Sequence, residues 1–232
     1  RRSSDLLGIR ARLLGGFSTV LALIVILTFV GITQVNRINH DLTTINDING
    51  VKLRHAIDWR GSVHDRAILL RDMVMVTQRD ELERLRDDYQ ALADNYRAAS
   101  EGMDNVMTAN AASQEERRLL NVIDSQADRT NALADEIMAE RDDGNVNEAR
   151  NLLLNSAGPA FFQWLDDINA FIDHQEAKTA RDTASARETA SSFQVLMLAL
   201  CLAALIIGGL IAYLLSRQLL RELGAEPHEV KA

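Results

Sequence analysis

The stretch LRHAIDWRGSVHDRAILLRDMVMVTQ, from Leu53 to Gln78, decides the fold of this chain. It contains no proline, and steps of three and four residues pick out a stripe that is apolar in its middle except at one position. The stripe runs through Ala56, Arg60, Val63, Ala67, Leu70, Val74 and Thr77. This spacing predicts one helix with Arg60 on its buried face. A buried guanidinium needs an acidic partner, so the identity of that partner bears directly on function.

The composition is typical of an almost wholly helical protein. The 232 residues include two prolines and 12 glycines, and 47% of them are hydrophobic. Residues 33–192 hold 18 Lys and Arg against 29 Asp and Glu, within a net charge of −8 for the chain. An acidic middle argues against nucleic acid as a partner, because phosphate binding requires a basic surface. This middle has no cysteine, so no disulfide framework is expected, and Cys201 lies inside an apolar run.

Two runs are long enough and apolar enough to be transmembrane helices. Residues 13–35 and 193–215 each contain 23 residues, and a bilayer core of about 30 Å needs roughly 20. Arginines precede the first run and follow the second, which predicts that residues 1–12 and 216–232 are cytoplasmic. Residues 36–192 then form a sensor domain on the other side. A cleaved signal peptide is the alternative for the first run, but the run is longer than the apolar part of such a peptide.

Between the two spans the sequence predicts an all-α fold, an up-down-up-down antiparallel four-helix bundle. The second helix is expected to open at Asp80, with Glu83 as its capping partner. The third is expected to open in the same way at Ser113, with Glu116 as partner. A turn at residues 142–145 leads into the fourth helix.

The two outer helices carry further predictions. No proline separates the first apolar run from Leu53, so both should belong to one unbroken helix. In the fourth helix, Gly158 and Pro159 should cause a kink and leave carbonyls near Asn155 free. The reason is that proline lacks an N–H and clashes with the carbonyl four residues before it.

Polar residues interrupt the apolar seams at similar depths in the bundle, counted at about 1.5 Å per residue from the turns far from the membrane. The candidate ligand-binding residues are Arg60, His64, Arg66, Arg71, Tyr89, Tyr96, Gln126 and Thr130. A small organic acid, such as a di- or tricarboxylate, would satisfy these groups together, with Arg60 forming a bidentate pair.

Other interpretations of these residues stay open. In the alternatives, Asp167 neutralises Arg60 in an internal ion pair, or Arg60 stacks on Trp164. Arg66 lies about 120° from Arg60 around the helix and is expected on another surface, facing solvent or a second subunit. His64 is expected at the surface, with no other histidine at metal-ligand spacing. No phosphate loop or nucleophile pattern is present, so catalysis, a metal and a cofactor are not expected.

A short motif near the end carries a family resemblance. Leu223-Gly224-Ala225-Glu226-Pro227 resembles the start of the HAMP linker in bacterial methyl-accepting chemotaxis proteins. The stretch WRGSVHDRAILLRD, Trp59 to Asp72, is similar to the first periplasmic helix of the four-helix-bundle sensor domains of that family. With the two spans, the resemblance covers the whole chain. It implies a homodimeric receptor in the inner membrane of a Gram-negative bacterium, with its sensor domain in the periplasm. Such a receptor controls a chemotaxis histidine kinase through a coupling protein.

The chain also departs from that family. It stops at Ala232, soon after the HAMP start, so the cytoplasmic signalling part is missing and the sequence looks truncated. Arg66 and Arg71 match the first step of the arginine arrangement of the aspartate receptor, but Met75 stands in the third place. Ser-Ala-Gly-Pro at residues 156–159 replaces the expected ligand-binding threonine. These departures argue against aspartate and leave other organic acids open.

The resemblance implies a mechanism, and the sequence leaves rivals to it. Ligand binding is expected to shift the fourth helix against the first and to pass a small slide or rotation into the second span. The same sensor on a transmembrane histidine kinase or cyclase is one rival. A scaffold bundle without a ligand is another, and a bundle that senses through a docked periplasmic binding protein is a third.

Overall fold

A computed structural model describes the backbone of residues 2–223 and the side chains of residues 14–214, 216 and 217. The chain forms two compact units, one of residues 42–183 and the other of residues 1–41 with 184–232. All the elements in the described part of the chain are helical, which confirms the all-α prediction. The HAMP-like motif continues through residues 224–227, which lie outside the described residues.

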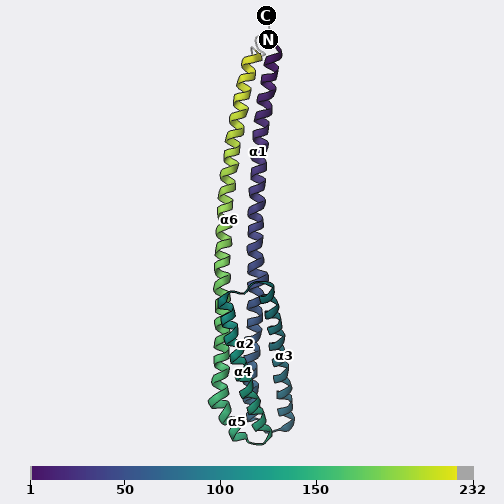
Figure 1. Ribbon diagram of the computed structural model, residues 1–232, viewed down its shortest axis with the longest axis vertical. Coiled ribbons are helices and arrows are strands. Elements are labelled where there is room, and N and C mark those ends of the chain that lie inside the picture. Colours follow the sequence, from purple (N-terminus) through teal and green to yellow (C-terminus); the bar gives the residue numbers. More distant parts are fainter. Residues whose placement is uncertain (1, 224–232) are drawn as a thin grey trace. The chain divides into compact units, whose positions relative to one another are not determined.

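Residues 42–183 form the predicted antiparallel four-helix bundle (Figure 1). In chain order the elements are α1 (Arg2–Thr43), η1 (Thr44–Asn49), α2 (Gly50–Met75), α3 (Arg79–Ala109), α4 (Gln114–Asp142), α5 (Val146–Leu152), η2 (Leu153–Ala157) and α6 (Gly158–Leu223). The helices α2, α3 and α4 are the first three of the bundle. The fourth consists of α5, the π-helical turn η2 and the first part of α6.

The core is built from one apolar stripe on each helix. On α6 the predicted residues Phe161, Trp164, Ile168 and Phe171 are all buried. Aromatic rings contact one another across the bundle, with Tyr96 of α3 lying 5.1 Å from Trp164 and 5.7 Å from Trp59 of α2, measured between ring centroids. These contacts tie the fourth helix to the first two.

The buried stripe of α2 differs in phase from the prediction. Steps of three and four residues pass through Lys52, Ala56, Trp59, Val63, Arg66, Leu70 and Met73, all of them buried. Arg60 is exposed, so the prediction that it lies in the seam is wrong. Arg66 is the buried arginine instead, and Lys52 is a second buried cation. The observed phase buries the large apolar side chain of Trp59. Transfer of this apolar area out of water favours the observed phase over the predicted one.

The ends of the helices match the prediction in one case and not in another. Ser113 Oγ accepts from the Glu116 amide at 3.1 Å, and the Glu116 carboxylate accepts from the Ser113 amide at 2.7 Å, which confirms the capping box of α4. The predicted cap at Asp80 is wrong. Helix α3 begins at Arg79, and its N-cap residue is Gln78, two positions before Asp80. Gln78 makes no side-chain capping bond.

Two π-helical turns interrupt the outer helices. The first apolar run continues into α2 as helix, as predicted, because η1 joins α1 to α2 and the residues that flank η1 keep helical backbone angles. In the fourth helix, where the sequence predicts a kink with free carbonyls, the backbone forms the π-helical turn η2 just before Pro159. At each turn a glycine amide bonds the carbonyl five residues earlier, Gly50 to Ile45 and Gly158 to Leu153. The wider turn accommodates a proline that has no N–H to donate.

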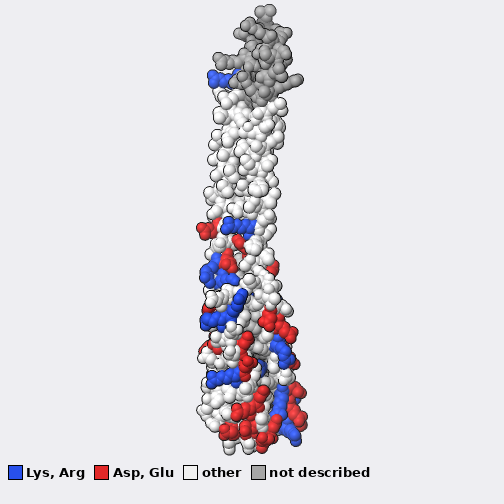
Figure 2. Space-filling model, in the orientation of Figure 1, with Lys and Arg blue, Asp and Glu red and all other residues white. Residues whose placement is uncertain are grey.

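The second unit contains the apolar runs. Two helical stretches are long and apolar enough to cross a membrane, and none of the side chains in their most apolar windows is buried. Phe17 and Phe29 near the start of the chain are each 72% exposed. On the face drawn in Figure 2, charged side chains gather over the bundle, whereas the apolar helices show mostly uncharged ones.

Candidate functional site

Arg66 reaches from α2 into the interior of the bundle and is only 4% exposed. Its Nη2 donates to Tyr89 Oη on α3 at 2.9 Å and to Asn131 Oδ1 on α4 at 2.5 Å. Its guanidinium carbon lies 4.6 Å from the ring centroid of Tyr89 and 5.4 Å from that of Trp164 on α6. Side chains from the other three helices of the bundle therefore surround this one cation.

The Arg66 guanidinium has no carboxylate among the described residues within 4.0 Å, the limit for an ion pair. Its Nε and the hydroxyl of Tyr96 are buried without a hydrogen-bond partner. Neutral acceptors and aromatic rings offset only part of the several kcal/mol that burial of a charge costs. The arrangement leaves a cationic donor available for an anion.

Burial also determines the state of the two tyrosines. It raises the pKa of the Tyr89 phenol, although the charge of Arg66 and its hydrogen bond act in the opposite direction. Burial likewise raises the pKa of Tyr96 above its ordinary value. Both hydroxyls therefore stay protonated at neutral pH and are able to donate hydrogen bonds to an anion.

A groove of about 590 Å³ opens between α3 and α4, with Arg66 of α2 contributing to its wall. Its lining includes Tyr89, Tyr96 and Asn131, together with two further arginines, Arg86 and Arg97, and two aspartates, Asp87 and Asp135. Arg86 pairs with an aspartate of α4, and Arg97 pairs with an aspartate of α3 at 2.9 Å. Three predicted site residues, Arg66, Tyr89 and Tyr96, thus lie at one groove, whose volume suits a small molecule.

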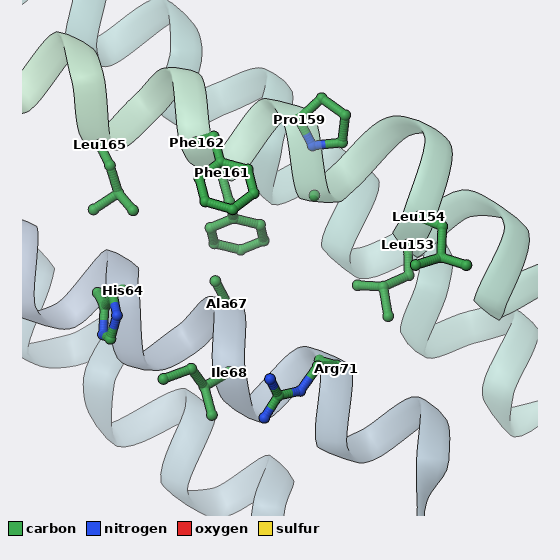
Figure 3. A pocket seen from close by; sticks show the side chains of 11 residues that line it. His64, Ala67, Ile68, Arg71, Leu153, Leu154, Pro159, Phe161, Phe162 and Leu165 are labelled. Atoms are coloured by element: carbon green, nitrogen blue, oxygen red, sulfur yellow. The ribbon is translucent and has the colours of Figure 1, made fainter.

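Two other predicted site residues, His64 and Arg71, line a different groove of about 410 Å³. Figure 3 shows them on α2, opposite apolar side chains of η2 and α6. Both side chains are exposed, and each lies within about 3 Å of the aspartate that follows it in sequence. The other wall carries Leu154 and Phe162, which are 65% and 71% exposed. This groove is apolar, and its arginine, Arg71, is already paired.

Gln126 and Thr130 make their hydrogen bonds inside the protein. Gln126 Nε2 donates to the carbonyl of Ala160 on α6 at 2.9 Å. The Thr130 hydroxyl donates to the carbonyl of Gln126 at 2.7 Å and is fully buried. The structure places both residues between α4 and α6, and neither lines the groove beside Arg66.

The sequence model of a known family matches residues 6–190, which is most of the chain. That family is described as a four helix bundle sensory module for signal transduction. This chain belongs to it. The family resemblance predicted from the Trp59–Asp72 stretch is confirmed, and the family is a sensory module of chemoreceptors rather than a catalytic domain. Comparison with curated proteins finds no match.

Two predictions about the arginines of this sensory module are wrong. Arg60 is exposed on α2, and Asp167, its predicted internal partner, instead accepts from Gln163 at 2.9 Å. Arg66, predicted to face solvent or another subunit, is buried inside the bundle. Both errors have one cause. The buried phase of α2 includes Trp59 and Arg66 where the prediction had Arg60 and Ala67.

Sequence reasoning also missed residues of the sensory module. Asn131, which accepts from Arg66 Nη2, follows the candidate residue Thr130 directly and has no local signal of its own. Lys52 lies two heptads before Arg66 in the same stripe, a signal that the correct phase of α2 would have revealed. Among the residues that the structure describes, no group of three His, Cys, Asp or Glu side chains is placed to hold a metal ion.

Proposed function

We propose that this chain is the sensing region of a transmembrane chemoreceptor and that it binds a small organic acid, such as a di- or tricarboxylate, beside Arg66. The observation that carries the proposal is a 96% buried guanidinium that faces a groove and lacks a carboxylate. A ligand carboxylate would supply the acceptor that Arg66 Nε lacks. The hydroxyl of Tyr96 would donate to the same ligand, and a further carboxylate would reach Arg86 or Arg97 only by competing with the aspartates that already pair with them.

The proposed site lies inside one bundle. Arg66, Tyr89, Tyr96 and Asn131 all come from one chain, and Arg66 is enclosed by the other helices of its own bundle. One chain therefore binds one ligand, whether or not it is part of a dimer. This arrangement separates ligand recognition from subunit contacts.

Ligand binding would reach the output through α6. Arg66 lies over the ring of Trp164, and α6 runs from there to Leu223 as a single helix. An anion that draws the guanidinium toward the groove changes the packing of Trp164. A ligand biases α6 only by its differential affinity for two positions of that helix. The shift would pass through the second span and the HAMP linker to a chemotaxis histidine kinase and its coupling protein.

The proposal includes the setting of the chain. Residues 13–35 and 193–215 would cross the inner membrane of a Gram-negative bacterium, and residues 36–192 would lie in the periplasm. The arginines near both termini support this orientation. The receptor would be a homodimer, and the exposed side chains of Leu154 and Phe162 provide an apolar face for the second copy.

Isothermal titration calorimetry on the full chain in lipid nanodiscs tests the ligand. Malate, succinate and citrate are the probes, and Arg66→Ala is compared with Arg60→Ala. Arg60 is the matched control because it is an exposed arginine on the same helix. Loss of a charge-assisted hydrogen-bonding group at about 1.5–3 kcal/mol predicts binding roughly 10-fold to 100-fold weaker for Arg66→Ala. Unchanged binding is expected for Arg60→Ala.

The Arg66→Ala protein must still fold for this comparison, which circular dichroism checks. If it does not fold, Tyr96→Phe replaces it as the test variant, since it removes only a hydroxyl that has no partner. Absence of binding for all three probes, or equal losses in the Arg66 and Arg60 variants, contradicts the proposal.

A further inference from the structure

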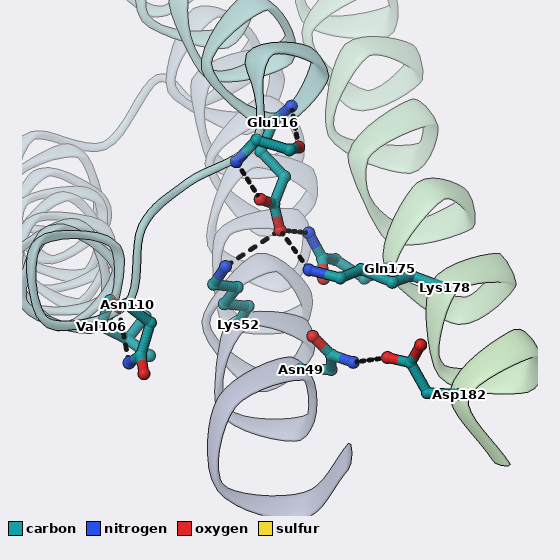
Figure 4. A network of polar contacts seen from close by, with 9 residues as sticks. Asn49, Lys52, Val106, Asn110, Glu116, Gln175, Lys178 and Asp182 are labelled. Carbon is teal, nitrogen blue, oxygen red and sulfur yellow. Dashed lines mark hydrogen bonds and ion pairs between the residues drawn. The ribbon is translucent and has the colours of Figure 1, made fainter. Parts of the chain in front are cut away.

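A second polar cluster lies at the end of the bundle where α4 begins, and it is centred on Glu116 (Figure 4). One oxygen, Oε1, accepts from Lys52 Nζ of α2 at 2.9 Å and from Gln175 Nε2 of α6 at 2.8 Å. The same oxygen lies 3.3 Å from Lys178 Nζ, also on α6. The other oxygen accepts from the Ser113 amide. Glu116 thus joins α2, α4 and α6.

This cluster is buried, and its central group is ionised. Glu116 and Gln175 have no exposed surface, and Lys52 is 1% exposed. Burial alone would raise the pKa of Glu116, but hydrogen bonds from Gln175, from the Ser113 amide and from Lys52 outweigh it and hold the pKa far below its usual range. Loss of this carboxylate would leave buried cationic and amide donors without their acceptor.

The cluster contacts the face of α6 that also carries Trp164, which lies against the Arg66 guanidinium. Gln175, Lys178 and Asp182 are spaced at i, i+3 and i+7, and Asp182 accepts from Asn49 of η1 at 2.8 Å. Trp164 lies 11 residues before Gln175, three turns along the same face and about 16 Å away. A displacement of α6 at Trp164 therefore acts directly on the contacts of Glu116.

Two donors from α6 bond Glu116 at once, so the cluster would keep one of them after a small slide of this helix in either direction. Gln175 and Lys178 are one turn apart on α6 and both reach Glu116 Oε1, Gln175 at the shorter distance. A slide of about 1.5 Å, the rise of one residue, would draw Lys178 closer and carry Gln175 away, or the reverse. Glu116 keeps an α6 donor in both positions. Buried Gln175 Oε1 and Asn49 Oδ1 also lack partners, so the present arrangement is not fully satisfied.

We propose that Glu116 is a latch that sets the axial position of α6 against α2 and α4. The ligand part of this inference rests on the proposed function, because occupancy at Arg66 would act through Trp164 on the same helix. The latch itself depends only on the contacts of Glu116, and the test separates the two.

Distances between two spin labels on the full chain in nanodiscs, measured by double electron–electron resonance, test the latch. The labels are placed on cysteines introduced at Arg54 of α2 and Asp166 of α6, both exposed, with Cys201 changed to serine. The two positions lie at different depths in the bundle, so an axial slide of α6 changes their separation. Glu116→Gln is compared with Glu115→Gln, the exposed neighbour whose ion pair within the described part of the chain is with Arg118 on its own helix, and on which His174 of α6 acts only weakly.

The expected result is a shift of the distance distribution by about 1–2 Å, or a second population, in Glu116→Gln alone. Identical distributions in Glu116→Gln and the unchanged chain overturn the latch, and so does an equal shift in Glu115→Gln. If Glu116→Gln loses its helix content, Lys178→Met is measured instead, because Lys178 is partly exposed and Glu116 keeps its other donors. A smaller shift of the distance distribution in Lys178→Met supports the latch. An unchanged distribution overturns it.

A ligand arm completes the test. Malate added to the unchanged chain should move the distribution toward that of Glu116→Gln. Binding of malate in the calorimeter without such a movement overturns the link between the latch and the ligand. Absence of malate binding counts against the proposed function, whereas the comparison of Glu116→Gln with Glu115→Gln still decides the latch.

Discussion

Arg66 and Trp164 join the proposed ligand site to the fourth helix of the bundle, with the guanidinium carbon 5.4 Å from the centroid of the indole ring. Arg66 lines the groove between α3 and α4, and Trp164 is fully buried on α6. Any movement of the guanidinium toward an anion therefore changes the surroundings of an indole. This relationship makes ligand occupancy visible in tryptophan fluorescence.

We predict that malate or another bound acid changes the tryptophan emission of the full chain and that Trp164→Phe removes most of this change. Trp59→Phe is the matched control. Trp59 is also buried, and it stacks on Tyr96 and not on the guanidinium. Fluorescence titration of the three proteins gives the answer. A change that disappears in Trp59→Phe and persists in Trp164→Phe contradicts the arrangement proposed here.

Loss of the hydroxyl should affect the stability of the protein differently at the two tyrosines of the groove. Tyr96→Phe removes a buried hydroxyl that makes no hydrogen bond of normal geometry, although the Trp164 indole lies near enough to act on its pKa, so without ligand the melting temperature should change little. Tyr89→Phe removes one of the two acceptors of Arg66 Nη2 and should cost about 1–3 kcal/mol, roughly 2–12 °C in melting temperature. Circular dichroism melts test this, and equal losses in both variants contradict it.

The helices of the bundle were predictable, whereas the phase of α2 was not. Ala56, Val63 and Leu70 belong to the predicted stripe and to the observed one, so the apolar pattern alone fits both. Each phase also buries one arginine. The energetic cost of a buried charge therefore does not favour one phase over the other. The observed phase is stabilised by the partners of Arg66 on other helices, Tyr89 and Asn131, which local periodicity does not identify.

Contacts between distant parts of the chain limit what the sequence reveals. The capping box of Ser113 and Glu116 was predictable because its residues are three positions apart. The bond from Lys52 to the same Glu116 joins residues 64 positions apart, and no local pattern signals it. The interruption at Pro159 was predictable from its missing N–H. The sequence does not show that the interruption takes the form of a π-helical turn, because that form depends on the close approach of Gly158 to Leu153.

That approach leads to a prediction about Gly158. A Cβ atom there would lie 3.0 Å from the carbonyl oxygen of Leu153, so Gly158→Ala should force η2 to rearrange and should destabilise the bundle by about 1–3 kcal/mol. Gly61→Ala is the matched control, because nothing lies within 4 Å of a Cβ there and alanine favours a helix over glycine by about 1 kcal/mol. The melting temperature should fall for Gly158→Ala and rise slightly for Gly61→Ala. The reverse order contradicts the tight packing of η2.

The latch residue Glu116 should give the bundle a stability that depends on pH. The folded pKa of Glu116 lies far below its ordinary value, while an unfolded glutamate has a pKa of about 4.3. Its contribution is therefore fully present above about pH 5 and is lost as the pH falls below the unfolded pKa toward the folded one. Near neutral pH, Glu116→Gln should cost about 3–5 kcal/mol, because it breaks a buried ion pair.

Melting temperatures of the unchanged chain, Glu116→Gln and Glu115→Gln between neutral pH and about pH 3 test this prediction. The gap between the unchanged chain and Glu116→Gln should be widest above pH 5 and should narrow on acidification, because only the unchanged chain has this carboxylate to protonate. Glu115→Gln should follow the unchanged chain throughout, because Glu115 is half-exposed and pairs at the surface. A gap that is the same at every pH would show that Glu116 acts through packing alone, with no stabilising charge in the latch.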